Sequence, residues 1–390
     1  MSSDATDRRL CGPLLHVGSA AADLVHGGFR IETFLDLSNR GLALVLCHGD
    51  LGGDAPLLAR VHSSCMTSES FGGCDCDCAG QLDAALEAIA RAGRGVVFYL
   101  LQEGRGAGFV AKARDRMMVQ ASSNRVTTFD AYARMGLGRD YRRYETVAFA
   151  AAALGITAPL ALLTNNPDKV DAVRHAAVAI AAVLPLERAP SPFNLHYLAA
   201  KSRSGHALRT PRPPRTSAAL PEPVAYFEPH PLPERPRFVR VASYLLPIRG
   251  RNAVHWFRLH AYFDLLAQRE RVVFTYLRER AAVPLLRVER ESLLARFPQR
   301  RPPSGLGWRE SVERIASRGA GAALFVLHDD PAGGDARSAA AIVAADADLT
   351  WLLARHVSQD RAELLTDAGG AHADETALRA ALERERLALT

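Results

Sequence analysis

The first half of the chain alternates between strand-like and helix-like segments. Apolar and polar positions alternate over residues 29–34, a continuous apolar run follows over 42–47, and residues 56–61 again read as a strand. Residues 81–93 place apolar side chains at helical spacing and end in glycine, which predicts a helix capped at that glycine. An apolar run over residues 96–101 predicts a buried strand. The order of these elements predicts an α/β fold.

The same alternation continues further along the chain. Residues 145–154 predict a helix, and residues 160–164 predict another strand. Asn166-Pro167 has the N-cap residue and first-turn proline that start a helix. A helix start that follows a strand presents free backbone N–H groups, which favour phosphate. We therefore expect an anionic group to bind at this end of the sheet.

A Pro- and Arg-rich stretch separates this region from a second one. The chain then divides into a first domain over 1–208, a semi-rigid linker over 209–236 and a second α/β domain over 237–390. Residues 310–327 resemble residues 84–101: both segments contain a helical pattern, then glycines, then an apolar strand. We expect a degenerate second copy of the first domain. Two unrelated α/β domains with similar helix–strand units are the alternative.

The composition limits the partners of the protein. The 390 residues carry a formal net charge of +6, and this positive charge comes from arginine because Lys112, Lys169 and Lys201 are the only lysines. The arginines are spread along most of the chain without a nucleic-acid-binding signature, so we expect no nucleic-acid partner. A small phosphate-bearing substrate also requires arginines.

Export and membrane insertion are not expected either. The N-terminus lacks the apolar core of a signal peptide. No run of about 18 apolar residues predicts a membrane span. The sequence therefore predicts a cytoplasmic protein whose cysteines stay reduced and whose partners do not include a membrane.

Residues 65–78 contain four of the six cysteines. Cys65 is separated by ten residues from the pair Cys76 and Cys78, and residues two apart on an extended segment point to the same side. Thiolates at this spacing favour zinc. A disulfide is the alternative, and it needs an oxidising compartment. Three protein ligands would leave a position open for water, whereas a fourth would close the site.

Five blocks along the chain carry a family resemblance. They are Arg60-Val-His-Ser-Ser-Cys65, Cys76-Asp-Cys78, Gln81-Leu, Gln102-Glu-Gly-Arg-Gly and Leu163-Thr-Asn-Asn-Pro-Asp-Lys169. Over about residues 14–208 the chain resembles GTP cyclohydrolase II, the first enzyme of riboflavin biosynthesis. The resemblance implies a mixed sheet with flanking helices. It also implies a zinc ion held by Cys65, Cys76 and Cys78, with Cys74 as an extra thiol.

The resemblance also assigns roles at the rest of the site. It makes Asp140 a proton-transfer residue and Arg142 the group that engages the α-phosphate, although this segment by itself is typical of an exposed charged turn. The residues that it places against the nucleotide are Arg60, Val61, His62, Ser63, Ser64, Gln81, Glu103, Gly104, Arg105, Thr128, Thr164 and Lys169.

The implied reaction acts on GTP or a related purine nucleotide. Zinc-bound water attacks carbon 8 of the guanine, the imidazole ring opens and formate leaves. Pyrophosphate is expelled separately, with the help of Mg²⁺, and the product is a diaminopyrimidinone ribosyl phosphate. Family members of this type form two-fold dimers, so we expect either a homodimer or a pseudo-dimer of the two halves.

Three positions depart from the family pattern. Arg116 stands in place of a tyrosine, Asp75 in place of an arginine, and Ser64 in place of a glutamate. These changes leave open a paralogue that stops at the formamide or uses another nucleotide, and also a non-catalytic nucleotide-binding regulator. In the second half the position of Cys65 falls near Ser292, and the Glu-Gly-Arg block becomes residues 329–331. That half contains no cysteine, so we expect no metal ligands there.

Overall fold

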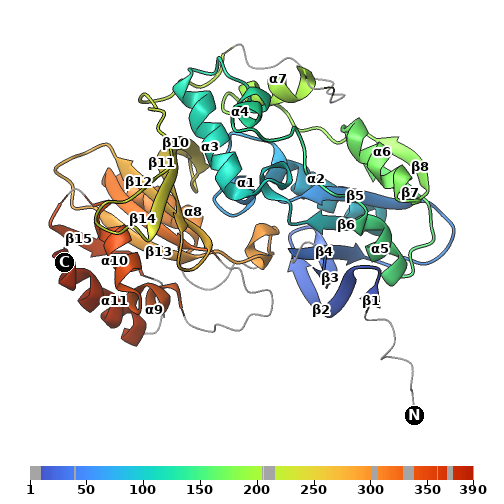
Figure 1. Ribbon diagram of the computed structural model, residues 1–390. Coiled ribbons are helices and arrows are strands. Elements are labelled where there is room, and N and C mark those ends of the chain that lie inside the picture. Colours follow the sequence, from blue (N-terminus) through green and yellow to red (C-terminus); the bar gives the residue numbers. More distant parts are fainter. Residues whose placement is uncertain are drawn as a thin grey trace.

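Two halves, each built on one sheet, make up the computed structural model. It describes residues 10–38, 41–203, 205, 216–300, 306–327, 338–357, 359–366 and 372–389. Residues 209–215 of the predicted linker and residues 329–331 lie outside the described residues. In Figure 1 the first half is blue to green, the second is yellow to red, and α3 (Gly108–Ala121) lies where they meet.

The first half contains a mixed sheet of eight strands. Its strands are β1 (Leu10–Cys11), β2 (Leu14–Leu24), β3 (Gly27–Asp36), β4 (Gly41–His48), β5 (Leu57–Ser63), β6 (Gly95–Leu100), β7 (Leu160–Leu163) and β8 (Ile180–Leu184). They are ordered β1-β2-β3-β4-β6-β5-β7-β8. The neighbours from β1 to β6 are antiparallel, and those from β6 to β8 are parallel. The predicted α/β fold is confirmed.

Helices follow the parallel strands. They are α1 (Met66–Glu69), α2 (Cys78–Ala92), η1 (Glu103–Gly106), α3, α4 (Thr128–Arg134), α5 (Thr146–Ala153), α6 (Pro167–His175) and α7 (Leu195–Arg203). Helix α2 ends at Gly93, whose φ of 75° lies in the left-handed region that suits glycine. Helix α6 begins as predicted, because the side chain of Asn166 accepts a hydrogen bond from the N–H of Asp168 at 3.0 Å.

The second half repeats this architecture. Its strands are β9 (His230–Pro231), β10 (Phe238–Arg249), β11 (Val254–Asp264), β12 (Arg269–Leu277), β13 (Leu285–Arg290), β14 (Ala320–Val326), β15 (Arg361–Leu364) and β16 (Ala388–Leu389). Its helices are η2 (Leu294–Arg296), α8 (Trp308–Arg318), α9 (Ala339–Ala344), α10 (Ala347–Ala354) and α11 (His372–Arg384). Read from β9, the order is β9-β10-β11-β12-β14-β13-β15-β16, with the same strand directions as in the first sheet.

The likeness extends to single glycines. A Cβ atom on Gly95 would lie 2.5 Å from the carbonyl oxygen of Leu58, and one on Gly321 would lie 2.5 Å from that of Leu285. Gly95 is the first residue of β6 and Gly321 is the second residue of β14; each strand follows a helix, and the neighbouring backbone leaves no room for a side chain there. Matching strand order and matching close contacts support our proposal that the second half is a degenerate copy of the first.

The two halves share a hydrophobic core. The ring of Phe71 lies 5.1 Å from that of Phe274 and 4.8 Å from that of Phe325, measured between centroids. The indole N–H of Trp308 donates to the carbonyl oxygen of Phe71 at 2.9 Å. Close to these rings, the backbone of β10 pairs with the cysteine-containing loop, because the N–H of Cys74 donates to Pro247 at 2.8 Å. The second half therefore supports the loop that carries the thiols.

Part of the predicted linker also packs against the protein. The N–H of Ala218 donates to the carbonyl oxygen of Pro192 at 2.8 Å, and Glu228 pairs with Arg114 of α3 at 3.1 Å. Val224 is buried in the shared core. Ala218, Val224 and Glu228 of the predicted linker therefore contact the folded parts of the chain. Among the described helices, none combines the length and apolar character needed to span a bilayer.

Candidate active site and metal centre

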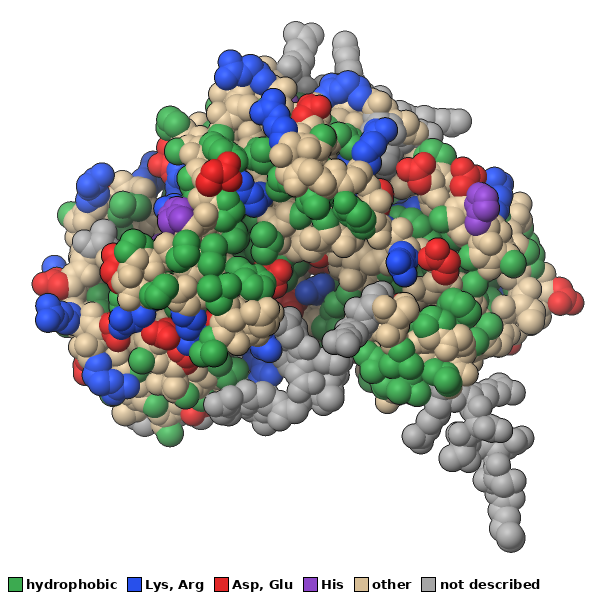
Figure 2. All heavy atoms as spheres, in the orientation of Figure 1, with side chains coloured by type: hydrophobic (Ala, Val, Ile, Leu, Met, Phe, Trp, Pro, Cys, Tyr) green, Lys and Arg blue, Asp and Glu red, His purple; other side chains and the backbone are tan. Residues whose placement is uncertain are grey.

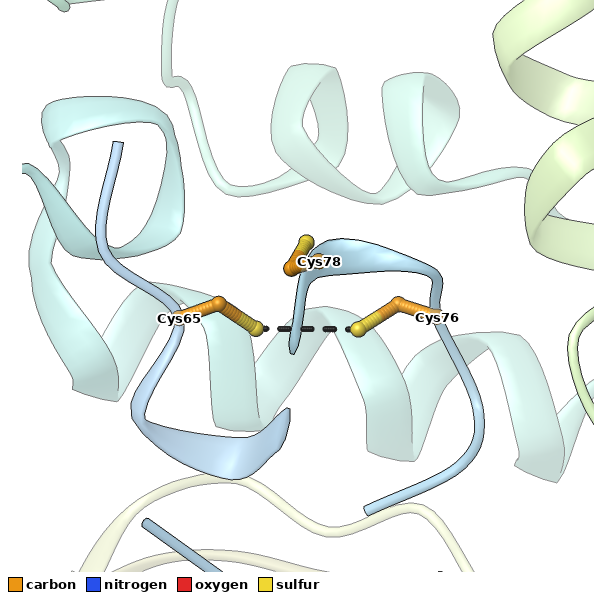
Figure 3. A group of neighbouring side chains, drawn as sticks. All are labelled: Cys65, Cys76 and Cys78. Atoms are coloured by element: carbon orange, nitrogen blue, oxygen red, sulfur yellow. Dashed lines mark hydrogen bonds between the residues drawn. The ribbon is translucent and has the colours of Figure 1, made fainter. Parts of the chain in front are cut away.

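The thiols of Cys65, Cys76 and Cys78 converge at the start of α2, as Figure 3 shows. Their three Sγ atoms lie within 4.8 Å of one another, and those of Cys65 and Cys76 are 3.6 Å apart. The expected extended segment is wrong, because Cys76 lies in a bend and Cys78 is the first residue of α2. A turn into the helix, instead of strand alternation, brings the pair together.

Cys74 lies apart from these three thiols. Its Sγ atom is 3.6 Å from the carbonyl oxygen of Gly72. Among the described residues, the group of side chains that could together hold a metal ion contains Cys65, Cys76 and Cys78 and not Cys74. This arrangement agrees with the ligand set that the family resemblance implies.

Lys112 stands beside the thiols. Its ammonium group donates to Sγ of Cys65 at 3.0 Å and to a carboxylate oxygen of Glu103 at 2.6 Å. Hydrogen bonds from Cys76 and Cys78, together with the charge of Lys112, outweigh burial and hold the pKa of Cys65 well below its ordinary value. A thiolate is the form of cysteine that binds metal. The environment therefore favours a ligand at this position.

Six of the twelve predicted nucleotide-binding residues line a narrow basic pocket next to the thiols. The residues around it are Arg60, His62, Ser63, Cys78, Gln81, Arg142, Thr164, Asn165, Asn166, Lys169, Tyr197 and Lys201. The first turn of α6 opens onto this pocket, and the hydroxyl of Thr164 accepts from the N–H of Asn166 at 3.1 Å. Cations and a helix N-terminus together favour a phosphate group here.

Buried cations give this pocket its charge. Arg60 donates to the carbonyl oxygen of Leu163 at 2.8 Å and to the side chain of Gln81 at 2.7 Å. Lys169 donates to the carbonyl oxygen of Val61 at 2.9 Å. Burial lowers the pKa of Arg60 to about 10, and burial with the nearby arginines lowers that of Lys169 well below its ordinary value. A bound anion would relieve this repulsion, so the pocket is suited to phosphate.

Arg142, which lines the pocket, forms a close ion pair with Asp140. Nε of Arg142 lies 2.9 Å and 3.0 Å from the two carboxylate oxygens of Asp140. Although burial raises the pKa of Asp140, its hydrogen bonds with Arg142 hold that pKa below the ordinary value. The backbone N–H of Tyr141 donates to the carbonyl oxygen of Arg105 at 2.9 Å. The segment is thus anchored to η1 and directed at the site.

The Glu-Gly-Arg block lies in η1, next to the cysteine-containing loop of residues 65–78. Gly104 and Arg105 adopt left-handed conformations with φ of 56° and 57°. One carboxylate oxygen of Glu103 accepts from the N–H of Met66 at 2.5 Å, while the other pairs with Lys112. The guanidinium of Arg105 lies 3.8 Å from the ring centre of Phe129. Both carboxylate oxygens of Glu103 therefore have partners within the protein.

Thr128 and the two charged residues that depart from the family pattern, Arg116 and Asp75, line a further pocket. The hydroxyl of Thr128 donates to the carboxylate of Asp115 at 2.6 Å. Arg116 and Asp75, both nearly buried, form an ion pair at 3.0 Å. The guanidinium of Arg116 also lies 4.9 Å from the ring centre of Tyr197. The two departures from the family pattern are thus partners, and each charge neutralises the other.

A cavity of about 560 Å³ lies between the halves. Ser64, Gln102 and Glu103 line it from the first half, and Glu291 and Arg296 line it from the second. Figure 2 shows a hollow between the two halves, with charged side chains inside it. Residues on either side of Cys65 thus face different spaces, because Ser64 and Met66 line this cavity and Ser63 lines the basic pocket.

Sequence reasoning missed several residues of the site. Lys112, Lys201 and Tyr197 occupy single positions on helices that carried no recognised motif. Lys201 pairs with Asp77 at 2.6 Å, and its ammonium lies 4.8 Å from the ring centre of Tyr197. One signal was available: all three lysines of an arginine-rich chain lie at this site, with Lys169 as the third.

Comparison with known proteins agrees with this geometry. The family model for GTP cyclohydrolase II matches residues 16–185. A GTP cyclohydrolase-2 of Teredinibacter turnerae is 39% identical over 194 residues, which are 50% of this chain and 96% of that protein. Relatives of the same name from Pseudomonas putida F1 and Shewanella amazonensis are each 37% identical; the matches cover 50% and 47% of this chain and 94% and 87% of those proteins. The chain belongs to the GTP cyclohydrolase II family.

Proposed function

We propose that this protein is a zinc-dependent GTP cyclohydrolase II, which opens the imidazole ring of GTP at carbon 8 and releases formate and pyrophosphate. The observation that carries this proposal is the position of three converging thiols beside a pocket with four buried or half-buried cations. The product is a diaminopyrimidinone ribosyl phosphate, and we place the reaction in riboflavin biosynthesis.

The donor set suits zinc. Three thiols within 4.8 Å are soft ligands at a separation that a tetrahedral ion can span. A set of three leaves one coordination position for a non-protein ligand, which is the arrangement of catalytic zinc sites. When bound, zinc supplies Lewis acidity and brings the pKa of water towards neutrality, as hydrolysis of a purine ring requires. Lys112 would keep Cys65 in the ligating form.

The basic pocket would hold the triphosphate. Arg60, Lys169 and the start of α6 surround the space next to Cys78. Arg142, which lines the same pocket, would engage the α-phosphate. Mg²⁺ carried by the nucleotide would assist the loss of pyrophosphate. Asp140, an ionised carboxylate paired with Arg142, would accept a proton during hydrolysis. We propose that Glu103 and the η1 backbone contact the base, with Glu103 exchanging one of its present partners for it.

Substitution of the ion pair tests this assignment. Asp140→Asn and Arg142→Ala should each retain zinc but reduce kcat for GTP by at least about 10²-fold, because one removes a proton acceptor and the other a phosphate contact. Metal analysis and a turnover assay on the same samples measure both quantities. Arg139→Ala, in the same segment, is the matched control and should remain active. Unchanged turnover in both test variants would make the segment an ordinary surface turn.

The pair of Arg116 and Asp75 favours a second candidate, an enzyme that opens the ring but deformylates slowly. A guanidinium stays protonated at any working pH, so Arg116 cannot donate and recover a proton as a phenol can. Its charge is also committed to Asp75 at 3.0 Å. We therefore expect the formamide to accumulate during turnover.

Restoring both family residues tests this second candidate. The double variant Asp75→Arg with Arg116→Tyr should raise the rate of formate release relative to ring opening by about 10²-fold. Arg116→Tyr alone would leave Asp75 as an unpaired buried charge, at a cost of about 3–5 kcal/mol in stability. Thermal unfolding separates that effect from chemistry. Formate released stoichiometrically by the unaltered protein, at the rate of ring opening, would exclude the slow-deformylation candidate.

A further inference from the structure

His62 has one ring nitrogen committed and the other free. Its Nε2 atom lies 2.7 Å from a carboxylate oxygen of Glu69, and both side chains are almost fully buried. Among the described residues, Nδ1 of His62 has no hydrogen-bond partner although it is buried. The residue lines the basic pocket next to the thiols. A buried, unpartnered polar atom at a pocket wall indicates a contact that a ligand completes.

Hydrogen bonds connect Glu69 to the second half of the chain. The hydroxyl of Tyr99 donates to the other carboxylate oxygen of Glu69. Arg296, which ends η2 in the second half, donates to the oxygen of Tyr99 at 3.4 Å and to Glu291 at 2.6 Å. All of these groups are shielded from water, with 8% of the Arg296 side chain exposed.

Donor and acceptor chemistry gives this chain of bonds a direction. Arg296 carries only donors, so the oxygen of Tyr99 accepts and its proton is directed at Glu69. Burial, together with Glu69, raises the pKa of Tyr99, and burial lowers that of His62. A neutral His62 must then donate from Nε2 to the Glu69 carboxylate, which leaves the Nδ1 lone pair facing the pocket.

The segment that carries Arg296 is the counterpart, in the second half, of the cysteine-containing loop of residues 65–78. The N–H of Ser64 donates to Leu100 at 2.8 Å, and the N–H of Glu291 makes the equivalent bond to Val326 at 3.0 Å. By this register the residue after Glu291 takes the place of Cys65. The second half has lost the metal ligand at this point, and the segment that follows reaches across the junction to the site in the first half.

We propose that Arg296 is a positioning residue for the nucleotide site: through Tyr99 and Glu69 it orients His62, so that the second half takes part in GTP binding. This inference rests on the proposed function, because it assumes that His62 contacts GTP. The degenerate copy is then a working part of the pocket as well as a packing partner.

Kinetics on the full chain test the inference. Arg296→Met should raise KM for GTP about tenfold while kcat changes less than about threefold, because a lost binding contact acts on both ground and transition states. Arg296→Lys keeps the charge and should recover part of the loss. Arg300→Met is the matched control: Arg300 also crosses the junction, to Asp23 at 3.4 Å, but the pair is exposed and makes none of the hydrogen bonds between Arg296 and His62. It should leave KM unchanged.

A double-mutant cycle separates positioning from general destabilisation. In a His62→Ala background, Arg296→Met should raise KM no further, whereas independent effects would multiply. The NMR signals of the His62 ring nitrogens give a readout that does not depend on turnover, and Arg296→Met should shift them away from the Nε2–H form. An unaltered protein that leaves GTP intact would overturn the proposed function. Normal KM and unchanged His62 signals in Arg296→Met would overturn this inference alone.

Discussion

Cys76→Ser should abolish zinc binding and GTP turnover, whereas Cys74→Ser should leave both near the level of the unaltered protein. Cys76 is one of three thiols within 4.8 Å, and a site with two remaining thiolates cannot hold zinc tightly. Substituting residues that hydrogen-bond the ligands of a zinc ion typically costs about 10–100-fold in zinc affinity. Loss of a direct ligand should cost more. Cys74 contacts a backbone carbonyl instead.

Metal analysis after dialysis against a weak chelator, combined with a turnover assay, measures this difference. Both variants replace a buried thiol by a hydroxyl in the same loop, so general effects on folding are matched. If Cys74→Ser lost zinc while Cys76→Ser retained it, our choice of ligands would be wrong. If both retained zinc, the metal would lie elsewhere in the chain.

Removal of residues 237–390 should leave a first half that aggregates or forms homodimers. Phe71, Phe109 and Met117 are almost fully buried in the core that the two halves share. Exposing such apolar area costs about 25 cal/mol per Å², and a contiguous exposed patch drives association. A two-fold partner of the same fold could cover this patch, which is why we propose that the intact chain is a pseudo-dimer.

Light scattering on the truncated and full-length proteins at several concentrations tests this prediction. The full chain should remain monomeric over a range in which the fragment associates. GTP turnover by the fragment should also fall, because β10 no longer supports the cysteine loop. A fragment lacking residues 237–390 that is monomeric and fully active would refute the pseudo-dimer and leave the second half without a role.

Local patterns predicted much of the architecture. Periodicity and caps placed the strands β3 to β7, helix α2 and the start of α6, because these features depend on nearby residues. The glycines at or next to the start of β6 and β14 belong to the sequence similarity that predicted a second copy of the first domain. Cys-x-Cys spacing predicted a metal site but not its shape, because the turn before α2 depends on how the loop docks on β10.

Contacts between segments that are distant in the sequence could not be predicted from local patterns. Nothing in the sequence near Phe71 or Trp308 indicates that the two pack together across the junction. Asp75 and Arg116 read as two separate departures from the family pattern, and only the fold shows that they are paired. Tyr197 and Lys201 reach the site from a helix that follows the predicted site segments. Such relationships arise from tertiary packing, which periodicity does not encode.

Incubation of the purified, zinc-loaded protein with GTP tests the central claim most directly. Formate, pyrophosphate and the ring-opened pyrimidine are followed in the same reaction, with Cys76→Ser protein as the blank. We predict zinc-dependent ring opening accompanied by pyrophosphate release, with formate appearing more slowly because Arg116 is paired with Asp75. GTP that remains intact in the presence of fully zinc-loaded protein would contradict the account and leave a nucleotide-binding protein without cyclohydrolase activity.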